Sequence, residues 1–257
     1  MLQQTQVARV LQKYPPFIRR YPRLSAISAA RTSELIRSWQ GMGYNRRALQ
    51  LKRLAQTVAI RYGAIPSDPA ELLQLPGVGR YTANAVACFA FGKQVTVVDT
   101  NVRRVLGRVY PEESRRRDAW EVAGMVLPKN GAEDWNQALM DLGSTLCTAS
   151  NPSCTGCPIA HLCPSAFRVA LSSRRPRTRL SKPARVPDRI YRGRIVDALR
   201  NLPSGKTAGI TTIARSLRQD ALPAGQRKIL LLLRGLERDG LISLTGSRLS
   251  VRAALPQ

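Results

Sequence analysis

Acidic side chains are scarce in this chain of 257 residues. It carries 16 Asp and Glu against 41 Lys and Arg, a formal net charge of +25, and residues 1–33 contain no carboxylate. Such an excess of one sign repels itself unless a polyanion neutralises it, so we expect a nucleic acid as the partner. A membrane surface is the alternative, but no segment has the one-sided basic pattern of an interfacial helix.

Long apolar runs are also lacking. The longest aliphatic run, Ile229–Leu233, falls far short of the ~20 residues that span a bilayer. The N-terminus has no apolar segment of the secretory kind. We therefore expect that the protein has no membrane partner and is cytoplasmic and nucleoid-associated. Hydrophobic residues make up 44% of the chain, which suffices for a buried core.

The positive charge is distributed unevenly. Residues 1–166 hold 21 basic and 11 acidic side chains, whereas the shorter segment 167–257 holds 20 and 5. Within it, residues 167–187 contain seven basic residues, three prolines and no acid. This composition predicts a linker that can also lie along phosphates.

Helical periodicity dominates residues 1–166. Val7, Val10, Leu11 and Tyr14 have the spacing of an amphipathic helix face. The stretch Ser67-Asp68-Pro69 is typical of a helix start, since a capping side chain precedes a proline at the first helical position. Strand-like alternation is scarce, so we expect a mainly α fold.

Residues 188–257 form a second periodic region. We expect helices around 190–202, 210–217 and 226–239, followed by a hairpin in GLISLTGSRLSV with Gly246 in its turn. Three helices and a two-stranded wing are the order of a winged helix-turn-helix. The alternative is a small helical cap. The predicted fold class is therefore mainly α, with a small C-terminal winged-helix-like α/β module.

Four of the five cysteines lie close together in the sequence, with the spacing C-x6-C-x2-C-x5-C. Disulfides are not expected in a cytoplasmic chain, so four neighbouring thiols indicate a metal centre. Zinc and an iron–sulfur cluster both suit four thiolates. The candidate ligands are Cys147, Cys154, Cys157 and Cys163, whereas Cys88 lies in an apolar run and is expected to be buried. The sole histidine, His161, is not expected to be a ligand.

A glycine-rich turn precedes a candidate catalytic acid. Helices are expected at 68–75 and 81–91, joined by Pro76-Gly77-Val78-Gly79. Gly77 and Gly79 would let backbone N–H groups approach a phosphate at a helix N-terminus. About twenty residues later, Asp99 follows two valines. Its alternative role is the N-cap of a helix over 100–106.

This order of motifs resembles the helix-hairpin-helix DNA glycosylase superfamily over residues 1 to about 166. The cysteine spacing is similar to the [4Fe-4S] loop of the endonuclease III-like members, which implies a [4Fe-4S] cofactor. The stretches MLQQTQV, WQGMGYNRRALQL, LPGVGRYTANAV, VVDTNVRRVLGR and WNQALMDLGSTLC look most like MutY-type adenine glycosylases. The implied domains are a helix-hairpin-helix domain at 1–95, an iron–sulfur domain at 96–166, the linker 167–187 and the module 188–257.

The resemblance implies roles for individual residues. Asp99 would stabilise the oxocarbenium-like sugar as the base leaves, and Asn101 would support it. Gln3, with its neighbour Gln4, and Tyr44 would act at the base stack around the flipped base. Candidate DNA contacts are Gly77, Gly79, Arg80, Arg103 and Arg104, and also Arg46 and Arg47, although any of these arginines can equally be solvated surface.

Tyr81 bears on the chemistry and on the substrate. The lyase-competent branch of the superfamily carries a lysine nucleophile here, so its absence predicts a monofunctional enzyme. The adenine branch usually has a small hydroxyl residue, and a tyrosine looks like the branch that removes thymine from T:G mismatches. The alternative for Tyr81 is simple packing at a helix start.

In the adenine glycosylases, a glutamate that acts as general acid precedes the matched MLQQ. Its position would lie before Met1, so we expect a chain that starts late. The leading function is excision of adenine opposite G or 8-oxoguanine in double-stranded DNA by a monomer. The alternatives are a glycosylase for thymine or uracil opposite G, and a catalytically impaired DNA-binding iron–sulfur protein.

Overall fold

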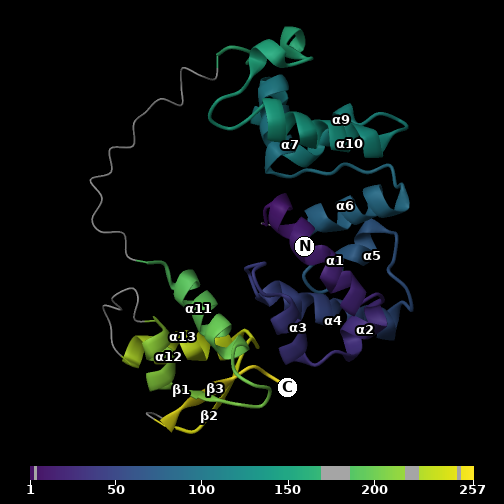
Figure 1. Ribbon diagram of the computed structural model, residues 1–257. Helices are drawn as coiled ribbons and strands as arrows, with labels where there is room; N and C mark the ends of the chain where they lie inside the picture. Colours follow the sequence, from purple (N-terminus) through teal and green to yellow (C-terminus); the bar gives the residue numbers. More distant parts are fainter. Residues whose placement is uncertain (3–4, 169–185, 218–225, 248–249) are drawn as a thin grey trace, which may run out of the picture. The chain divides into compact units, whose positions relative to one another are not determined.

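The computed structural model describes residues 1–2, 5–168, 186–217, 226–247 and 250–257. The described residues are mainly helical, as predicted, and they form two compact units (Figure 1). Unit one contains residues 1–64 and 181–257, and unit two contains residues 65–180. Among the residues that the structure describes, none of the helices has the length and hydrophobicity needed to span a bilayer.

The boundaries between the two compact units do not coincide with the predicted domain boundaries. The helix-hairpin-helix segment, predicted within 1–95, belongs to unit two, because Cys88 and Val97 share a buried core with Ala132. Most of the predicted linker 167–187 lies outside the described residues. The domain boundaries at 95, 166 and 187 stay predictions.

The first half of unit one consists of four helices, α1 (Val7–Arg20), α2 (Leu24–Ala29), α3 (Thr32–Ser38) and α4 (Arg46–Arg61). Aromatic rings form the centre of its core: Phe17 packs on Tyr21 with ring centroids 5.0 Å apart and edge-on against Trp39 at 5.8 Å. Such pairs stabilise a core beyond the area they bury. Val10 is buried in the same cluster.

The predicted helix at the N-terminus is present, but its predicted buried face is wrong. Val10 is buried, whereas Val7, Leu11 and Tyr14 are 62%, 68% and 52% exposed. The buried side chains of α1 are instead those of Val10 and Phe17, which lie on a different helical stripe. Two helical stripes overlap at Val10, and the periodicity of a short window does not choose between them.

The second half of unit one is the C-terminal module. Its elements are α11 (Asp188–Arg200), β1 (Ala208–Gly209), α12 (Ile210–Leu217), α13 (Gln226–Arg238), β2 (Ser243–Thr245) and β3 (Arg252–Ala254). The strands form an antiparallel sheet in the order β1-β3-β2, with Ala253 of β3 opposite Ala208 and Leu244. The predicted small C-terminal sheet is thus present, and the element order is that of a winged helix.

The module shares a core with the N-terminal helices of its unit. Ile36 of α3 and Leu49 of α4 belong to the same buried cluster as Ile195 and Leu233 of the module. The buried Arg200 guanidinium donates to the Ile36 carbonyl at 3.0 Å and to Asn45 Oδ1 at 2.8 Å. These contacts fix the module on α3 and α4.

Unit two contains the segments that carry the candidate site. Its helices are α5 (Pro69–Leu73), α6 (Arg80–Phe91), α7 (Thr100–Val109), α8 (Pro111–Arg116), α9 (Ala119–Val126) and α10 (Ala132–Asp141). A π-helical turn, η1 (Leu142–Leu146), and the 3₁₀ turns η2 (Cys154–Gly156) and η3 (Ala160–Leu162) follow. The C-terminal end of α10 therefore leads directly into the cysteine loop.

Candidate active site

The turn between α5 and α6 has the predicted helix-hairpin-helix form. Asp68 caps α5, because its Oδ1 accepts from the backbone N–H groups of Ala70 at 2.6 Å and Glu71 at 3.3 Å. Gly77 has φ +79°, which favours glycine, and Gly79 is the N-cap of α6. Both glycines are exposed, and Gly79 offers no capping side chain. The first turn of α6 is therefore open to an anion.

The segment leading to Asp99 is held by Asn136 of α10, which is 2% exposed. Asn136 Oδ1 accepts from the Val97 N–H at 2.8 Å, and Nδ2 donates to the Val95 carbonyl at 2.9 Å. A buried amide that is fully paired in this way fixes the backbone it bonds to. Two residues further on, the chain reaches Asp99.

Asp99 uses both of its carboxylate oxygens. Oδ1 accepts from the Val102 N–H at 2.7 Å, which makes Asp99 the N-cap of α7. Oδ2 accepts from Asn101 Nδ2 at 3.0 Å. Asp99 is therefore the N-cap of α7, as the alternative interpretation of the sequence proposed. The same geometry orients Oδ2 at a helix N-terminus, where negative charge is stabilised.

Arg104 connects Asn101 to the start of the cysteine loop. Its Nη2 donates to Asn101 Oδ1 at 2.8 Å and to the Gly143 carbonyl at 2.7 Å. Its Nε donates to the Cys147 carbonyl at 2.8 Å. The planar guanidinium thus holds three acceptors in a fixed arrangement, and these donors are engaged within the protein.

Gly143 is required by this arrangement. A Cβ at this position would lie 2.7 Å from Asn101 Cβ and 3.1 Å from the Asn101 carbonyl carbon. The π-helical turn η1 brings Gly143 against α7 at this point. A larger residue would displace Asn101 from Asp99.

Tyr81, in the first turn of α6, is half-buried and packs against the cluster of Cys88 and Val97. Burial, followed by the negative charge of Asp99, raises the pKa of the Tyr81 phenol above its ordinary value. The phenol therefore stays protonated at neutral pH. It can donate a hydrogen bond but is not a nucleophile.

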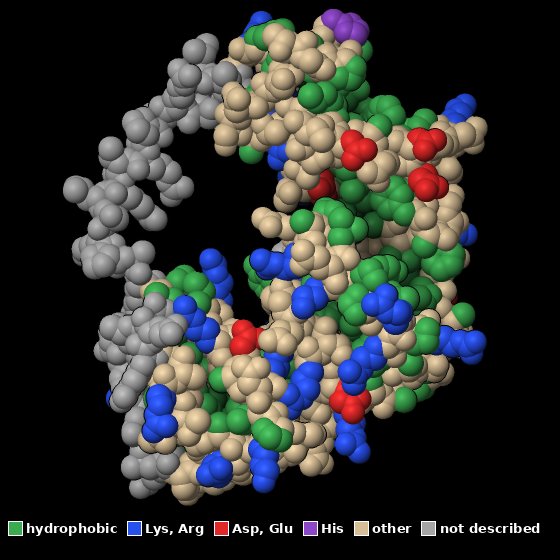
Figure 2. Space-filling model, in the orientation of Figure 1, with side chains coloured by type: hydrophobic (Ala, Val, Ile, Leu, Met, Phe, Trp, Pro, Cys, Tyr) green, Lys and Arg blue, Asp and Glu red, His purple; other side chains and the backbone are tan. Residues whose placement is uncertain are grey.

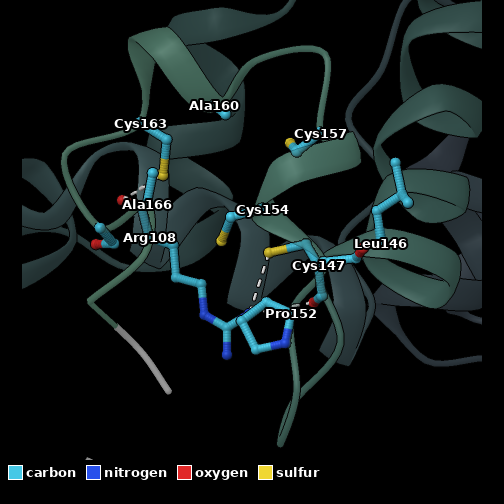
Figure 3. Close-up of a pocket in the computed structure, with 11 residues that line it drawn as sticks. Arg108, Leu146, Cys147, Pro152, Cys154, Cys157, Ala160, Cys163 and Ala166 are labelled. Atoms are coloured by element: carbon cyan, nitrogen blue, oxygen red, sulfur yellow. Dashed lines mark hydrogen bonds between the residues drawn. The ribbon is translucent and has the colours of Figure 1, made fainter. Parts of the chain in front are cut away.

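The four clustered cysteines line one pocket, together with Arg108, Leu146 and Pro152. In Figure 3 the sulfurs of Cys147, Cys154 and Cys163 point toward a common space. All five cysteines, which lie within the described part of the chain, are free thiols, and Cys88 is buried as expected.

The donor set fits an iron–sulfur cluster. Four cysteines line one pocket, and four thiolates are the ligand set of a [4Fe-4S] cluster, in which each sulfur binds a different iron.

Arg108 of α7 is the main polar contact of this pocket. Its Nη1 donates to Cys147 Sγ at 3.1 Å and to the Thr148 carbonyl at 2.8 Å, and its Nη2 donates to the Ala149 carbonyl at 3.1 Å. A guanidinium bonded to a ligand sulfur helps to orient that sulfur toward the metal site. His161 is exposed in η3 and does not line this pocket.

The remaining predicted residues are placed as follows. Gln3 and Gln4 lie outside the described residues. Tyr44, in unit one, is 58% exposed and has φ +42°, which is uncommon for a non-glycine residue and typical of functional positions. Arg47 is half-buried; it donates to Thr5 Oγ1 at 2.7 Å and lies over the Tyr44 ring at 5.7 Å. It therefore supports the Tyr44 loop.

Two candidate phosphate contacts of unit two are exposed. Arg80 lies 4.2 Å from the centroid of the Trp120 ring and forms a weak ion pair with Asp118 at 4.0 Å. Arg103 is exposed on α7, and its positive charge contributes to the lowered pKa of Asp118, whose main cause is the backbone hydrogen bond from Glu121. Both guanidinium groups can reach an anion in solution.

Sequence reasoning missed Asn136, Gly143 and Arg108. Asn136 and Gly143 lie in the stretch WNQALMDLGSTLC, but their roles depend on an approach to residues some forty positions earlier. Arg108 follows Arg104 by one helical turn, so it lies on the same face of α7. The four-residue spacing of Arg104 and Arg108 is the sequence signal that could have identified Arg108.

A helical fold with a glycine hairpin, an oriented carboxylate and a four-cysteine loop defines the class of helix-hairpin-helix base excision enzymes. The family described as "HhH-GPD superfamily base excision DNA repair protein" matches residues 1–123, and the "Iron-sulfur binding domain of endonuclease III" matches residues 147–163. The chain belongs to the HhH-GPD superfamily of DNA glycosylases, which hydrolyse N-glycosyl bonds, and it carries a [4Fe-4S] motif.

The similar proteins include adenine glycosylases. A protein of Mycolicibacterium smegmatis named "Adenine DNA glycosylase" is 41% identical in an alignment of 208 residues, which covers 78% of this chain and 69% of the relative. A Homo sapiens protein of the same name is 41% identical over 66% of this chain and 32% of its own length. The chain thus spans about two thirds of the mycobacterial relative and about one third of the human one.

Two solved structures have similar folds. A thermostable thymine-DNA glycosylase aligns with a TM-score of 0.60 and 34% identity over 65% of this chain and 80% of its own. A trapped covalent complex of endonuclease III with DNA aligns with a TM-score of 0.58 and 30% identity over 65% of this chain and 80% of its own. The expected DNA partner is supported by the complex.

Proposed function

We propose that this protein is a monofunctional adenine DNA glycosylase that removes adenine paired with G or 8-oxoguanine. The observation that carries this proposal is the oriented carboxylate of Asp99, with one oxygen bonded to the N-terminus of α7 and the other to Asn101. The names of the mycobacterial and human relatives support adenine as the base.

Asp99 would act on the sugar. As the C1′–N9 bond breaks, its electron pair leaves with the base and positive charge develops on the deoxyribose. A carboxylate fixed at that point stabilises the charge without reorganisation in the transition state. Water then attacks C1′ and loses a proton, and the departing adenine gains one, which leaves free adenine and an abasic site. Both Asp99 hydrogen bonds restrict rotation of the carboxylate, so we assign Asn101 as its positioning residue.

Arg104 is assigned to positioning as well. Its donors are engaged by Asn101, Gly143 and Cys147, so we propose that it orients Asn101 rather than binding phosphate. The four cysteines would hold the [4Fe-4S] cluster, which when bound cross-links the loop 147–163. Through Arg104, the conformation of that loop is coupled to Asn101.

We further propose that the enzyme is a monomer that acts on mismatched duplex DNA of the nucleoid. Gly77, Gly79, Arg80 and Arg103 would contact phosphates. Tyr44, exposed and held in the left-handed region, would insert beside the flipped base together with Gln3 and Gln4.

The second candidate is a thymine or uracil glycosylase for mismatches with G. Tyr81 stands where the adenine branch usually has a small hydroxyl residue, and one similar structure is a thymine-DNA glycosylase. Thymine and uracil leave more readily as anions than unprotonated adenine does, so Asp99 and a neutral Tyr81 phenol would suffice for them.

Base release under single-turnover conditions tests both candidates. Protein isolated from its own cells is mixed with labelled duplexes that contain A:G, A:8-oxoguanine, T:G or U:G. We expect adenine release, with strand cleavage only after alkali. Faster release of thymine or uracil would establish the second candidate. Binding without release of any base would contradict both, and cleavage without alkali would contradict a monofunctional enzyme.

A further inference from the structure

One face of α13 is exposed and basic. Arg227, Leu231, Arg234 and Arg238 are all exposed, and Leu231 is 63% exposed. Their spacing of four, three and four residues places them in a single stripe on a helix. At 1.5 Å per residue, the stripe is roughly 16 Å long.

The opposite face of α13 is buried, which fixes the direction of the stripe. Ile229, Leu232, Leu233 and Leu236 are 2%, 5%, 0% and 1% exposed in the core of the module. Turning the arginines inward would expose these four apolar side chains to water, which the hydrophobic effect opposes. The arginine stripe is therefore a permanent part of the surface.

The guanidinium groups of these three arginines are not neutralised by the described residues. Among those residues, none forms an ion pair or a side-chain hydrogen bond with them. The acidic side chains of the same segment are engaged elsewhere. Glu237 accepts from the Leu244 N–H at 3.1 Å, and Asp239 pairs with Arg192 and, at 3.7 Å, with Arg46. On the face shown in Figure 2, Lys and Arg side chains are likewise spread over the module with few acids among them.

The stripe is also held on a rigid base. Arg37 of α3 donates to the carbonyls of Arg200 and, at 2.8 Å, of Leu202. Arg200 of α11 donates in the opposite direction, to the Ile36 carbonyl of α3. One arginine from each part therefore bonds to the backbone of the other, and these bonds hold the module, including α13, against α3.

We propose that the exposed stripe of α13 is a second DNA-binding surface, which binds the backbone of undamaged duplex DNA. The major groove is about 12 Å wide, so arginines at the ends of a 16 Å stripe can reach phosphates on both of its walls. Leu231, between them, matches an apolar contact to a thymine methyl group or a sugar.

Charge and chemistry favour a duplex over an acidic protein as the occupant. The chain belongs to a family that acts on DNA, and a duplex presents regularly spaced phosphates in two rows. The surface does not depend on which base the enzyme removes, so it stands apart from the proposed function. It would keep the enzyme on undamaged DNA between lesions.

Fluorescence anisotropy with a 30-base-pair duplex without a mismatch tests the proposal on the whole protein. The variant R227Q/R234Q/R238Q removes three charges, and R227K/R234K/R238K is the matched control that keeps them. Each phosphate contact contributes about 0.9 to the slope of log K against log salt. We expect the Gln variant to lower the slope by about 2.7, which makes wild-type binding fall about 40-fold more between 50 and 200 mM salt.

The control should keep most of the slope, because a lysine also neutralises a phosphate. L231Q should weaken binding at every salt concentration and leave the slope unchanged, since it removes an apolar contact. All four side chains are exposed, and unchanged melting temperatures would show that folding is intact. An unchanged slope in the Gln variant would overturn the proposal and leave an acidic protein as the occupant of the stripe.

Discussion

The side-chain amide nitrogen of Asn101 donates to Asp99 Oδ2 at 3.0 Å, and Arg104 Nη2 in turn donates to the side-chain oxygen Oδ1 of Asn101 at 2.8 Å. The amide of Asn101 is therefore oriented from one end so that its N–H group faces the carboxylate. Since Asp99 Oδ1 caps α7, neither oxygen is free to rotate away from the position in which it acts.

Replacing Asp99 by Asn should separate catalysis from folding. Asn is about as good an N-cap as Asp, so the melting temperature should change little. The negative charge is lost, and we expect base release to slow by about 10²–10³-fold, as for other preorganised electrostatic groups. Single-turnover rates and thermal melting measure the two effects. D99A should in addition lose about 1 kcal/mol of stability, and normal base release by D99N would contradict the role of Asp99.

Arg104 and Arg103 are neighbours on α7 with different expected roles. R104K keeps the charge but loses the planar fork that holds three acceptors, so we expect slower base release at saturating protein with little change in DNA affinity. R103Q, on the exposed side of the helix, should weaken DNA binding and leave the saturated rate unchanged. Titration of the DNA and single-turnover rates distinguish them. Weaker DNA binding in R104K with a normal saturated rate would place Arg104 at a phosphate instead.

Removal of Arg108 should loosen the iron–sulfur loop. Its guanidinium bonds Cys147 Sγ and the carbonyls of Thr148 and Ala149. Side chains that support metal ligands typically contribute 10- to 100-fold to metal affinity, so R108Q should lose iron to a chelator about that much faster. Bleaching of the visible absorbance follows the loss. R115Q, which breaks an exposed ion pair with Glu112, is the control, and equal rates in both variants would refute the prediction.

The stability of the protein should depend on Tyr81 at alkaline pH. The pKa of its phenol is raised above the ordinary value of 10.0, by burial and then by the charge of Asp99. The stabilisation associated with the neutral phenol is complete below pH 10 and is lost as the pH rises through the raised pKa. The free energy of unfolding, measured with urea from pH 8 to 11, should fall more steeply in wild type than in Y81F. Y14F removes an exposed phenol and should follow wild type, and parallel curves for Y81F and wild type would contradict burial of the Tyr81 hydroxyl.

Local signals predicted local structure well. The helices expected over 210–217 and 226–239 were correct, because each follows from side-chain periodicity within one segment. The face of α1 was wrong, because two stripes overlap and tertiary packing selects between them. Asn136 and Gly143 were missed for a related reason: neither pattern nor propensity indicates which backbone will approach from the far side of the fold.

Gly143 illustrates such an approach and can be tested directly. A methyl group at this position would lie 2.7 Å from Asn101 Cβ, so G143A must displace either α7 or the π-helical turn. Overpacking of this kind costs about 1–3 kcal/mol, and any shift of Asn101 also withdraws the hydrogen bond to Asp99. We expect both a lower melting temperature and slower base release. Gly124, exposed on α9 with no atom within 4 Å of an added Cβ, is the matched control, and G124A should stabilise its helix by about 0.5–1 kcal/mol. If G143A behaved like G124A, the close packing of η1 on Asn101 would not hold in solution.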